Sequence, residues 1–358
     1  MTLAKLDVSN VRNIEAASIE PSSRLNFILG PNGSGKTSLL EAIHILGRAR
    51  SFRSTQAGQV IRFQQEELTV AGRVGECGSL LPAPIGVRLG RRKREIVLAG
   101  QKLQTSAELI RAFPVTLIQP ASNGLLEGAP KTRRQFLDWG AFHLDPGFLE
   151  QWRGYARALD QRNALLRTGD VRGIEIWNHE LSRYGTIVAL ARTAYTERLL
   201  PYFHAAAKHF LGGMALDLRI APGWDMDRNL DEVLREEIAP DLRDGHTHAG
   251  PHKGDFSIAL DGRSAKNYLS RGQMKLLVFA LLLAQAHLLE ESLGSKGCVL
   301  IDDLASELDS DNRGRLLQFL SVRQAQFFIT ATDPRILEQA GLEDAAVFHV
   351  EHGRVARV

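Results

Sequence analysis

The chain has 358 residues, of which 44% are hydrophobic and 24% charged, as is typical of a folded protein with a large core and about two domains. Its 44 basic and 41 acidic residues leave a net charge of only +3, so the overall charge does not indicate a nucleic-acid partner and any basic surface must be local. The cysteines, Cys77 and Cys298, form no metal-ligand spacing, and the longest apolar run, residues 276–284, is too short to cross a membrane. We therefore expect a cytoplasmic protein without a membrane partner.

The first predicted element is a strand at residues 6–11, where apolar and polar residues alternate. Its exit turn carries Arg12, which either faces a bound nucleotide or is solvated. A second, wholly apolar strand at residues 25–29 leads into a glycine-rich loop, and residues 38–46 then carry apolar side chains at helical spacing.

This loop, residues 30–37, fits the phosphate-binding pattern G-x-x-x-x-G-K-[ST] between a strand and a helix, which is the context that the motif needs. Its glycines let backbone N–H groups curl around an anion at the start of a helix. The predicted nucleotide-binding residues of the loop are Gly30, Pro31, Asn32, Gly33, Ser34, Gly35, Lys36 and Thr37. Lys36 would reach the β- and γ-phosphates, and Thr37 would offer its hydroxyl to Mg²⁺.

Basic residues recur after the loop-following helix. Three arginines surround Phe52 within residues 48–53, and they either contact phosphates or belong to an exposed connector. From residue 60 to residue 104, short alternating stretches bounded by glycine turns predict an antiparallel meander. One turn of this meander is either a solvated hairpin tip or a DNA-facing surface, and it consists of Arg91, Arg92, Lys93 and Arg94.

A further buried strand is predicted at residues 115–118, and it ends at Gln119, a candidate for approaching the metal or the attacking water. Residues 123–240 then turn helical. Bulky residues at three- and four-residue steps predict two antiparallel helices, a short hairpin resembling a coiled coil, with a turn at residues 168–170. Its seam is expected to be ordinary core packing, whereas three arginines of the first helix are candidates for DNA phosphate contact: Arg153, Arg157 and Arg162.

A long apolar helix is predicted from residue 270 to about residue 289. Ser270 and Gln273 form a capping box, which leaves free amides at Arg271 and Gly272 and hence an anion site. These residues either cap a core helix or form the signature motif of ATP-binding-cassette ATPases. If the helix came from a second molecule, one γ-phosphate would be held from two sides, so the pattern predicts an ATP-dependent homodimer.

The last chemical motif is an apolar strand at residues 298–301 that ends in two carboxylates. Asp302 is expected to hold Mg²⁺, and Asp303 to polarise the attacking water. Residues 306–309 follow as the D-loop. The next strand, residues 326–330, runs into residues 331–333, where cassette ATPases usually keep a histidine; none is present, so Thr330 and Thr332 are the candidates for sensing the γ-phosphate.

Together these motifs resemble the RecF family, which is related to the SMC and Rad50 heads, and the similarity covers essentially the whole chain. The resemblance implies an α/β fold: an ABC-type P-loop ATPase head, with a mixed sheet, helices and an antiparallel β subdomain, and an inserted helical arm lobe. We expect the head at residues 1–122 and 241–358 and the arm at residues 123–240. Two departures from the family pattern are Lys253, where arginine is common, and residues 119–122, where Pro-Glu-Asp or Pro-Glu-Gly is common.

The resemblance further implies an ATP-dependent DNA-binding protein of recombinational repair and replication. Weak, Mg²⁺-dependent ATP hydrolysis would reset it, and ATP-driven dimerisation would gate its binding to single-stranded, gapped or double-stranded DNA. RecR, with RecO, would be its partner in loading RecA and supporting the SOS response. The alternatives from the motifs are the ATPase subunit of an ABC transporter and a small-molecule phosphotransferase. The wide separation of Lys36 from Asp302, filled by a helical arm, argues against the first, and the signature motif against the second.

Overall fold

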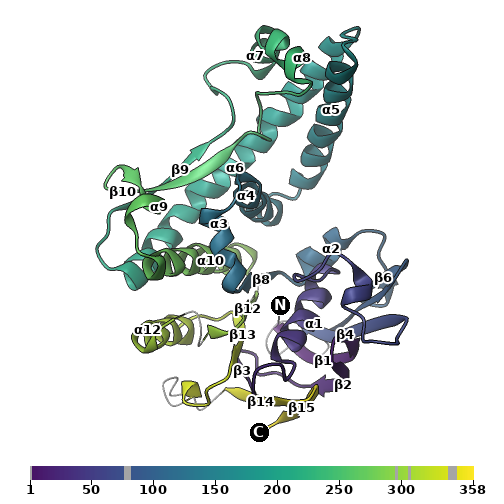
Figure 1. Ribbon diagram of the computed structural model, residues 1–358, viewed down its shortest axis with the longest axis vertical. Helices are drawn as coiled ribbons and strands as arrows, with labels where there is room; N and C mark the ends of the chain where they lie inside the picture. The colour runs from purple at the N-terminus through teal and green to yellow at the C-terminus, as the bar shows by residue number, and fades with distance from the viewer. Residues whose placement is uncertain (1, 76–81, 295–296, 305–307, 338–344) are drawn as a thin grey trace. The chain divides into compact units, whose positions relative to one another are not determined.

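The computed structural model describes residues 2–75, 82–294, 297–304, 308–337 and 345–358 (Figure 1). The chain divides into two compact units, residues 1–122 with 286–358, and residues 123–285. The second boundary lies within a helix, whereas the sequence led us to place it after residue 240. The observed boundary lies after residue 285 because residues 241–285 also belong to the helical unit. For example, the Gln285 side-chain amide donates to the Phe136 carbonyl at 3.1 Å and to the Tyr195 hydroxyl at 2.6 Å.

The first unit contains a largely parallel sheet that is made of short, wholly buried apolar strands, the pattern typical of a sheet covered on both faces. Its order is β15-β14-β3-β13-β12-β8, with only β15 antiparallel to its neighbour. In chain order its strands are β3 (Leu25–Leu29), β8 (Val115–Ile118), β12 (Cys298–Ile301), β13 (Gln326–Ala331), β14 (Ala346–Glu351) and β15 (Arg354–Arg357). The phosphate loop, Gln119 and Asp302 all follow carboxyl ends of parallel strands, the edge at which such sheets bind ligands.

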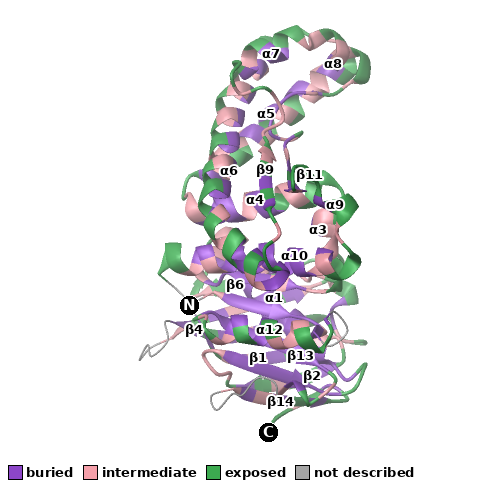
Figure 2. Cartoon of the chain, turned by 90° about the vertical axis from the view of Figure 1, so that its left-hand side faces the viewer, coloured by how far each residue is buried: buried purple, intermediate pink, exposed green. Residues whose placement is uncertain are grey.

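The second sheet of this unit is antiparallel throughout and has the order β2-β1-β4-β5-β6-β7. Its strands are β1 (Thr2–Val11), β2 (Ile14–Ile19), β4 (Glu67–Gly75), β5 (Ala83–Gly90), β6 (Arg94–Leu98) and β7 (Gln101–Lys102). The predicted meander is therefore confirmed, and the N-terminal strands extend it. Alternating burial along β1, β4 and β5 shows that one face of the sheet is turned to the core (Figure 2).

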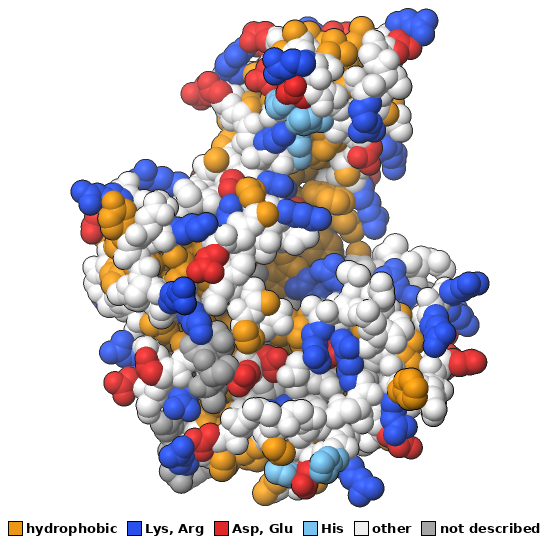
Figure 3. All heavy atoms as spheres, in the orientation of Figure 1, with side chains coloured by type: hydrophobic (Ala, Val, Ile, Leu, Met, Phe, Trp, Pro, Cys, Tyr) orange, Lys and Arg blue, Asp and Glu red, His pale blue; other side chains and the backbone are white. Residues whose placement is uncertain are grey.

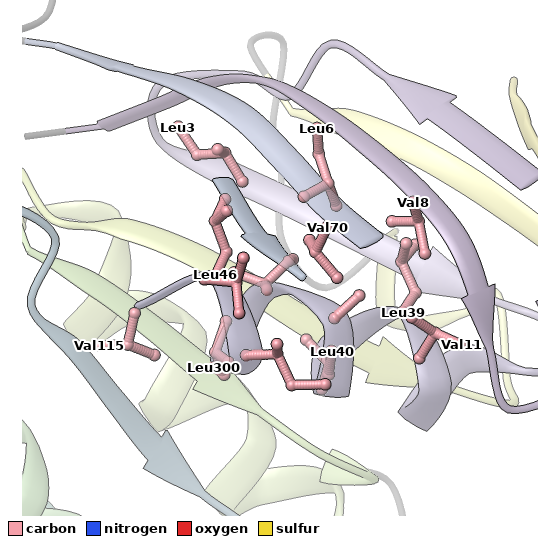
Figure 4. Packing of buried hydrophobic residues seen from close by; sticks show 14 of the residues in the cluster. Leu3, Leu6, Val8, Val11, Leu39, Leu40, Leu46, Val70, Val115 and Leu300 are labelled. Atoms are coloured by element: carbon pink, nitrogen blue, oxygen red, sulfur yellow. The ribbon is translucent and has the colours of Figure 1, made fainter. Parts of the chain in front are cut away.

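Helix α1 (Lys36–Arg48) lies in the core between the two sheets. Its apolar residues, such as Leu39 and Leu46, pack against Leu6 and Val70 of the antiparallel sheet and Leu300 of the parallel sheet (Figure 4). Other short helices in the part of this unit that the structure describes include η1 (Ala57–Gln59), α2 (Ser106–Ala112), η2 (Pro120–Asn123) and α12 (Ser310–Ser321). Because α1 begins directly at the phosphate loop, this packing fixes the loop against both sheets.

The second unit is built on the predicted helical hairpin, α5 (Phe148–Thr168) and α6 (Ile174–Leu211) (Figure 1). Gly169, with φ 70°, ends α5 in a left-handed conformation that suits glycine. The helices approach closely: a Cβ on Gly154 would lie 2.6 Å from the Tyr184 ring. The other helices are α3 (Gly124–Glu127), α4 (Pro130–Leu144), α7 (Leu230–Glu236), α8 (Ile238–Asp244), α9 (Ala265–Tyr268) and α10 (Arg271–Leu293), which continues into the first unit.

This unit also contains a small antiparallel sheet that the sequence reading did not predict. Its order is β11-β10-β9, with β9 at Leu216–Ala221, β10 at Asp255–Leu260 and β11 at Arg263–Ser264. One helix of the described chain, α10, is long and apolar enough to cross a membrane by length and composition, but 67% of its apolar window is buried, as in the core helix of a protein.

Candidate nucleotide-binding site

A cavity of about 370 Å³ opens at the carboxyl edge of the parallel sheet in the first unit. It is lined by the phosphate loop and the start of α1, by residues that follow β12 and end β13, and by three residues from other loops. The lining outside the loop and α1 consists of Asn13, Arg53, Pro120, Asp302, Asp303 and Thr330. The two motifs that lie at opposite ends of the sequence thus meet in one pocket.

The phosphate loop adopts backbone angles that require glycine. Gly30 has φ 155°, and a Cβ there would lie 2.2 Å from the Val350 carbonyl oxygen. Gly33, with φ 76°, faces open space. Beside it, Ser34 Oγ is buried and has no hydrogen-bond partner among the described residues. An open glycine cradle with an unsatisfied buried hydroxyl fits an oxyanion such as a phosphate.

Lys36 is held at the mouth of this cradle. Its Nζ donates to the carbonyl oxygens of Gly30 at 2.8 Å and Pro31 at 2.9 Å. Burial lowers the pKa of Lys36, while the nearby carboxylates of Asp303 and Asp302 raise it. The amine therefore sits next to negative charge in a partly desolvated site, where its positive charge acts strongly on a phosphate.

Asp302 receives hydrogen bonds from two threonine hydroxyls. Thr37 Oγ1 lies 3.0 Å from Asp302 Oδ1 and 3.2 Å from Oδ2, and Thr330 Oγ1 lies 2.8 Å from Oδ1. Burial raises the pKa of Asp302, and the hydrogen bonds from Thr330 and Thr37 oppose that rise. The described residues contain no group of three His, Cys, Asp or Glu side chains able to hold a metal. Thr37 and Asp302 nevertheless fit Mg²⁺, which takes few protein oxygens and completes its shell with phosphates and water.

Asp303 lines the pocket and has an unusual backbone conformation. Its φ is 53°, in the left-handed region that non-glycine residues seldom adopt. Its N–H donates to Thr330 Oγ1 at 2.7 Å. A strained conformation held by a hydrogen bond at the edge of a pocket is a feature typical of functional residues.

Arg12, which we expected either to face a bound nucleotide or to be solvated, is instead paired with Glu41. Its guanidinium forms a two-pronged ion pair with Glu41, at 2.8 Å from Nε to Oε2 and 2.9 Å from Nη2 to Oε1, and also donates to the Gln59 carbonyl. Glu41 is fully buried, accepts from the Ser51 hydroxyl and lies 3.8 Å from Arg53 Nη1. Arg53, not Arg12, lines the pocket.

The sequence analysis missed one residue that lines the pocket, Asn13, and one buried residue that pairs with a pocket arginine, Glu41. Asn13 bridges the loop and α1, because its Nδ2 donates to the Ser34 carbonyl at 3.0 Å and its Oδ1 accepts from Ser38 Oγ at 3.0 Å. Glu41 anchors both arginines. A carboxylate between the apolar residues Leu40 and Ala42 of α1 was the available signal for Glu41, whereas the position of Asn13 depends on long-range packing.

Gln119 follows β8, and its backbone N–H donates to Ser122 Oγ at 3.0 Å. Its neighbour Pro120 lines the pocket. The role of Gln119 as a metal ligand stays a prediction. The predicted D-loop falls partly on residues 305–307, which lie outside the described residues, and its last member, Asp309, caps α12 by accepting from the Asn312 N–H at 2.9 Å.

The capping box at the start of α10 is present in the second unit. Ser270 N–H donates to Gln273 Oε1 at 2.9 Å, and Gln273 N–H donates to Ser270 Oγ at 3.2 Å. Ser270, Arg271 and Gly272 are exposed. The helix therefore presents its N-terminal amides to solvent, in a chain whose own pocket is lined by the first unit.

The DNA-contact candidates divide into two groups. Arg153 and Arg157 are exposed on α5, and residues 91–94 are exposed at the turn between β5 and β6. Figure 3 shows basic side chains scattered among acidic ones over the face that it draws.

The prediction that Arg162 contacts DNA is wrong, because its side chain is fully buried. Its Nη1 lies 2.5 Å from Asp241 Oδ2 and 2.8 Å from Thr247 Oγ1, and its Nε lies 2.7 Å from Asn178 Oδ1. It joins α5, α6 and α8 inside the second unit.

Comparisons with known proteins show what the chain is similar to. Residues 2–356 match the RecF/RecN/SMC N terminal domain family. The chain is 42% identical to the DNA replication and repair protein RecF of Pseudomonas paraeruginosa and 43% identical to that of Pseudomonas aeruginosa, with 100% of this chain and 98% of each relative covered.

Among solved structures, the chain resembles the recombination mediator protein RecF-ATP in the RecFOR pathway, with TM-score 0.87, 27% identity and coverage of 100% and 97%. The corresponding RecF-ATPrS structure gives TM-score 0.87 at 26% identity, with coverage of 99% and 98%. An Smc head bound to the C-winged helix domain of ScpA matches with TM-score 0.60 at 16% identity, which supports the fold alone.

Proposed function

The chain belongs to the RecF family, and from this membership we propose that it is a DNA replication and repair protein that uses ATP binding and slow ATP hydrolysis as a switch for DNA binding. The observation that carries the proposal is the convergence of Lys36, Thr37, Asp302 and Asp303 on one pocket. Residues 1–122 and 286–358 would form the ATPase unit, and residues 123–285 the arm.

The side chains of the pocket have separable roles. Lys36 is the point charge for the β- and γ-phosphates, and the carbonyl oxygens of Gly30 and Pro31 keep its ammonium in place. Ser34 Oγ and the loop amides receive the phosphate oxygens. Thr37 and Asp302 hold Mg²⁺, directly or through water. When bound, ATP would supply the reactive phosphoryl group, and Mg²⁺ would supply positive charge that offsets the negative charge of the phosphates.

Asp303 is the candidate general base. It lies one residue beyond Asp302, lines the same pocket and is held by the bond from its N–H to Thr330. A carboxylate in that place orients a water molecule and takes up its proton. Arg53, whose side chain is 47% exposed and only loosely paired with Glu41, is available to bind a phosphate oxygen.

We further propose that ATP joins two copies of the chain. The exposed N-terminus of α10 offers its free amides to the γ-phosphate bound by another copy, so that Ser270 and Gly272 of each molecule complete the other's site. ADP lacks that phosphate. The dimer would therefore form with ATP and separate after hydrolysis.

DNA is the proposed ligand of the switch, in single-stranded, gapped or double-stranded form, and the exposed arginines at positions 91, 92, 94, 153 and 157, with Lys93, are its candidate contacts. Because the similar solved structures are RecF proteins of the RecFOR pathway, we infer a RecR-like partner, acting with a RecO-like protein, and a cytoplasmic location. The ABC transporter alternative is not favoured, since the full-length relatives are DNA repair proteins.

Isothermal titration with ATP in the presence of Mg²⁺ tests the site. We expect the parent to bind ATP, Lys36→Met to lose most of that affinity, and Lys102→Met to keep it, because Lys102 is an exposed lysine of β7 paired with Glu95. Equal affinities in Lys36→Met and the parent would reject the pocket assignment.

A further inference from the structure

Thr330 connects the two acidic residues of the pocket. It lies near the end of β13, is fully buried and yet lines the cavity. Its hydroxyl donates to Asp302 Oδ1 at 2.8 Å and accepts from the Asp303 N–H at 2.7 Å. One side chain on one strand thus holds the residues that follow the neighbouring strand, β12.

This arrangement excludes one of the roles that the sequence left open for Thr330. A hydroxyl has a single proton to donate, and here Asp302 receives it. Thr330 is therefore not set to donate a hydrogen bond to a γ-phosphate. Thr332, the other candidate sensor, is exposed.

The backbone of Asp303 explains what the second bond does. With φ 53°, Asp303 adopts a left-handed backbone conformation, which is unfavourable for residues other than glycine unless surrounding contacts stabilise it. Its N–H is fixed by Thr330 Oγ1, so the direction in which the chain leaves β12, and with it the placement of the Asp303 carboxylate, depends on that hydroxyl.

We propose that Thr330 is a positioning residue for hydrolysis: its hydroxyl fixes the Asp302 carboxylate for the metal and holds the left-handed turn that aims Asp303. The inference rests on the proposed ATPase function. It assigns Thr330 no contact with the nucleotide, so its loss should impair Mg²⁺ use and turnover more than the capture of the nucleotide phosphates by Lys36 and the loop.

Thr330→Val replaces the hydroxyl with a methyl group of similar size. We expect kcat to fall about 10- to 100-fold, and the Mg²⁺ concentration for half-maximal rate to rise, as is usual when a partner of a metal-binding carboxylate is removed. ATP affinity measured without Mg²⁺ should stay within about twofold, because the phosphate loop is unchanged. Thr330→Ser keeps the hydroxyl and should recover most of the rate.

A second measurement needs no hydrolysis. Hydrogen exchange of the backbone amides at residues 302–304, without nucleotide, should show a protected Asp303 amide in the parent and in Thr330→Ser, and faster exchange in Thr330→Val. Thr116→Val is the matched control, because Thr116 is a buried threonine of β8 in the same sheet. Its exchange at residues 302–304 and its kcat should equal those of the parent.

The outcomes separate cleanly. Parental kcat and exchange in Thr330→Val would overturn the inference, as would a Thr330→Ser variant as impaired as the valine variant, since that would assign the effect to packing. If Thr330→Val does not fold, Thr330→Ala against Thr330→Ser repeats the comparison. A parent that hydrolyses no ATP would instead reject the proposed function, while the exchange comparison would still decide the hydrogen bonds.

Discussion

The buried pair between Arg162 and Asp241 gives the sharpest prediction about the arm. Both side chains are 0% exposed, and the arginine also reaches Asn178, Thr247 and the Leu234 carbonyl. Arg162→Met therefore leaves a buried carboxylate without its cation. Breaking such a pair costs about 3–5 kcal/mol in the free energy of unfolding. In a unit of this size each kcal/mol lowers Tm by about 2–4 °C, so we expect a drop of about 6–20 °C.

Urea denaturation followed by tryptophan fluorescence measures this loss, since Trp152 and Trp177 lie on the hairpin. Arg153→Met is the matched control: its arginine is exposed, and its effect on stability should stay within about 0.5 kcal/mol. Arg162→Met combined with Asp241→Asn should cost less than the two single changes added together, because the second removes the stranded charge. A loss below about 1 kcal/mol in Arg162→Met would refute the reasoning.

Three other predictions concern the proposed cycle. Asp303→Asn should bind ATP and Mg²⁺ as the parent does but accumulate the ATP-bound form, which a single-turnover assay measures; normal hydrolysis would place the base elsewhere. Ser270→Arg should keep monomer ATP affinity yet fail to dimerise in light scattering with ATP, whereas a variant that still dimerises would reduce Ser270 to a helix cap of about 1 kcal/mol. Replacing Arg153 and Arg157 with alanine should lower the slope of log affinity for duplex DNA against log salt by about 1.8, and an unchanged slope would assign both arginines to solvent.

The pocket was predictable from sequence where its chemistry is local. The phosphate-loop pattern needs two glycines and a lysine in fixed spacing, and Asp302 needs only a short apolar strand before it, so both are predictable without knowledge of the fold. The pairing of Glu41 with Arg12 and of Thr330 with Asp303 could not be found in this way. These contacts join segments that only the packing of α1 and the parallel sheet brings together.

Two errors in the arm had signals that were present in the sequence. The buried residues of α5 include Tyr155, Ala158, Arg162 and Leu166, which repeat at three- and four-residue steps, so Arg162 stands at a seam position where an arginine must be paired. Residues 216–220 alternate apolar and polar side chains, the period of a strand, but the surrounding helical composition outweighed this short pattern.

Whether ATP in the pocket controls DNA binding is tested by the affinity for a fluorescent gapped duplex, measured by anisotropy at one salt concentration. We expect an affinity at least about tenfold higher with ATP than with ADP or without nucleotide, which corresponds to a coupling free energy of about 1.4 kcal/mol. Asp303→Asn should keep the tight binding, and Lys36→Met should lose the difference. Equal affinity of the parent in all three nucleotide conditions would contradict the claim.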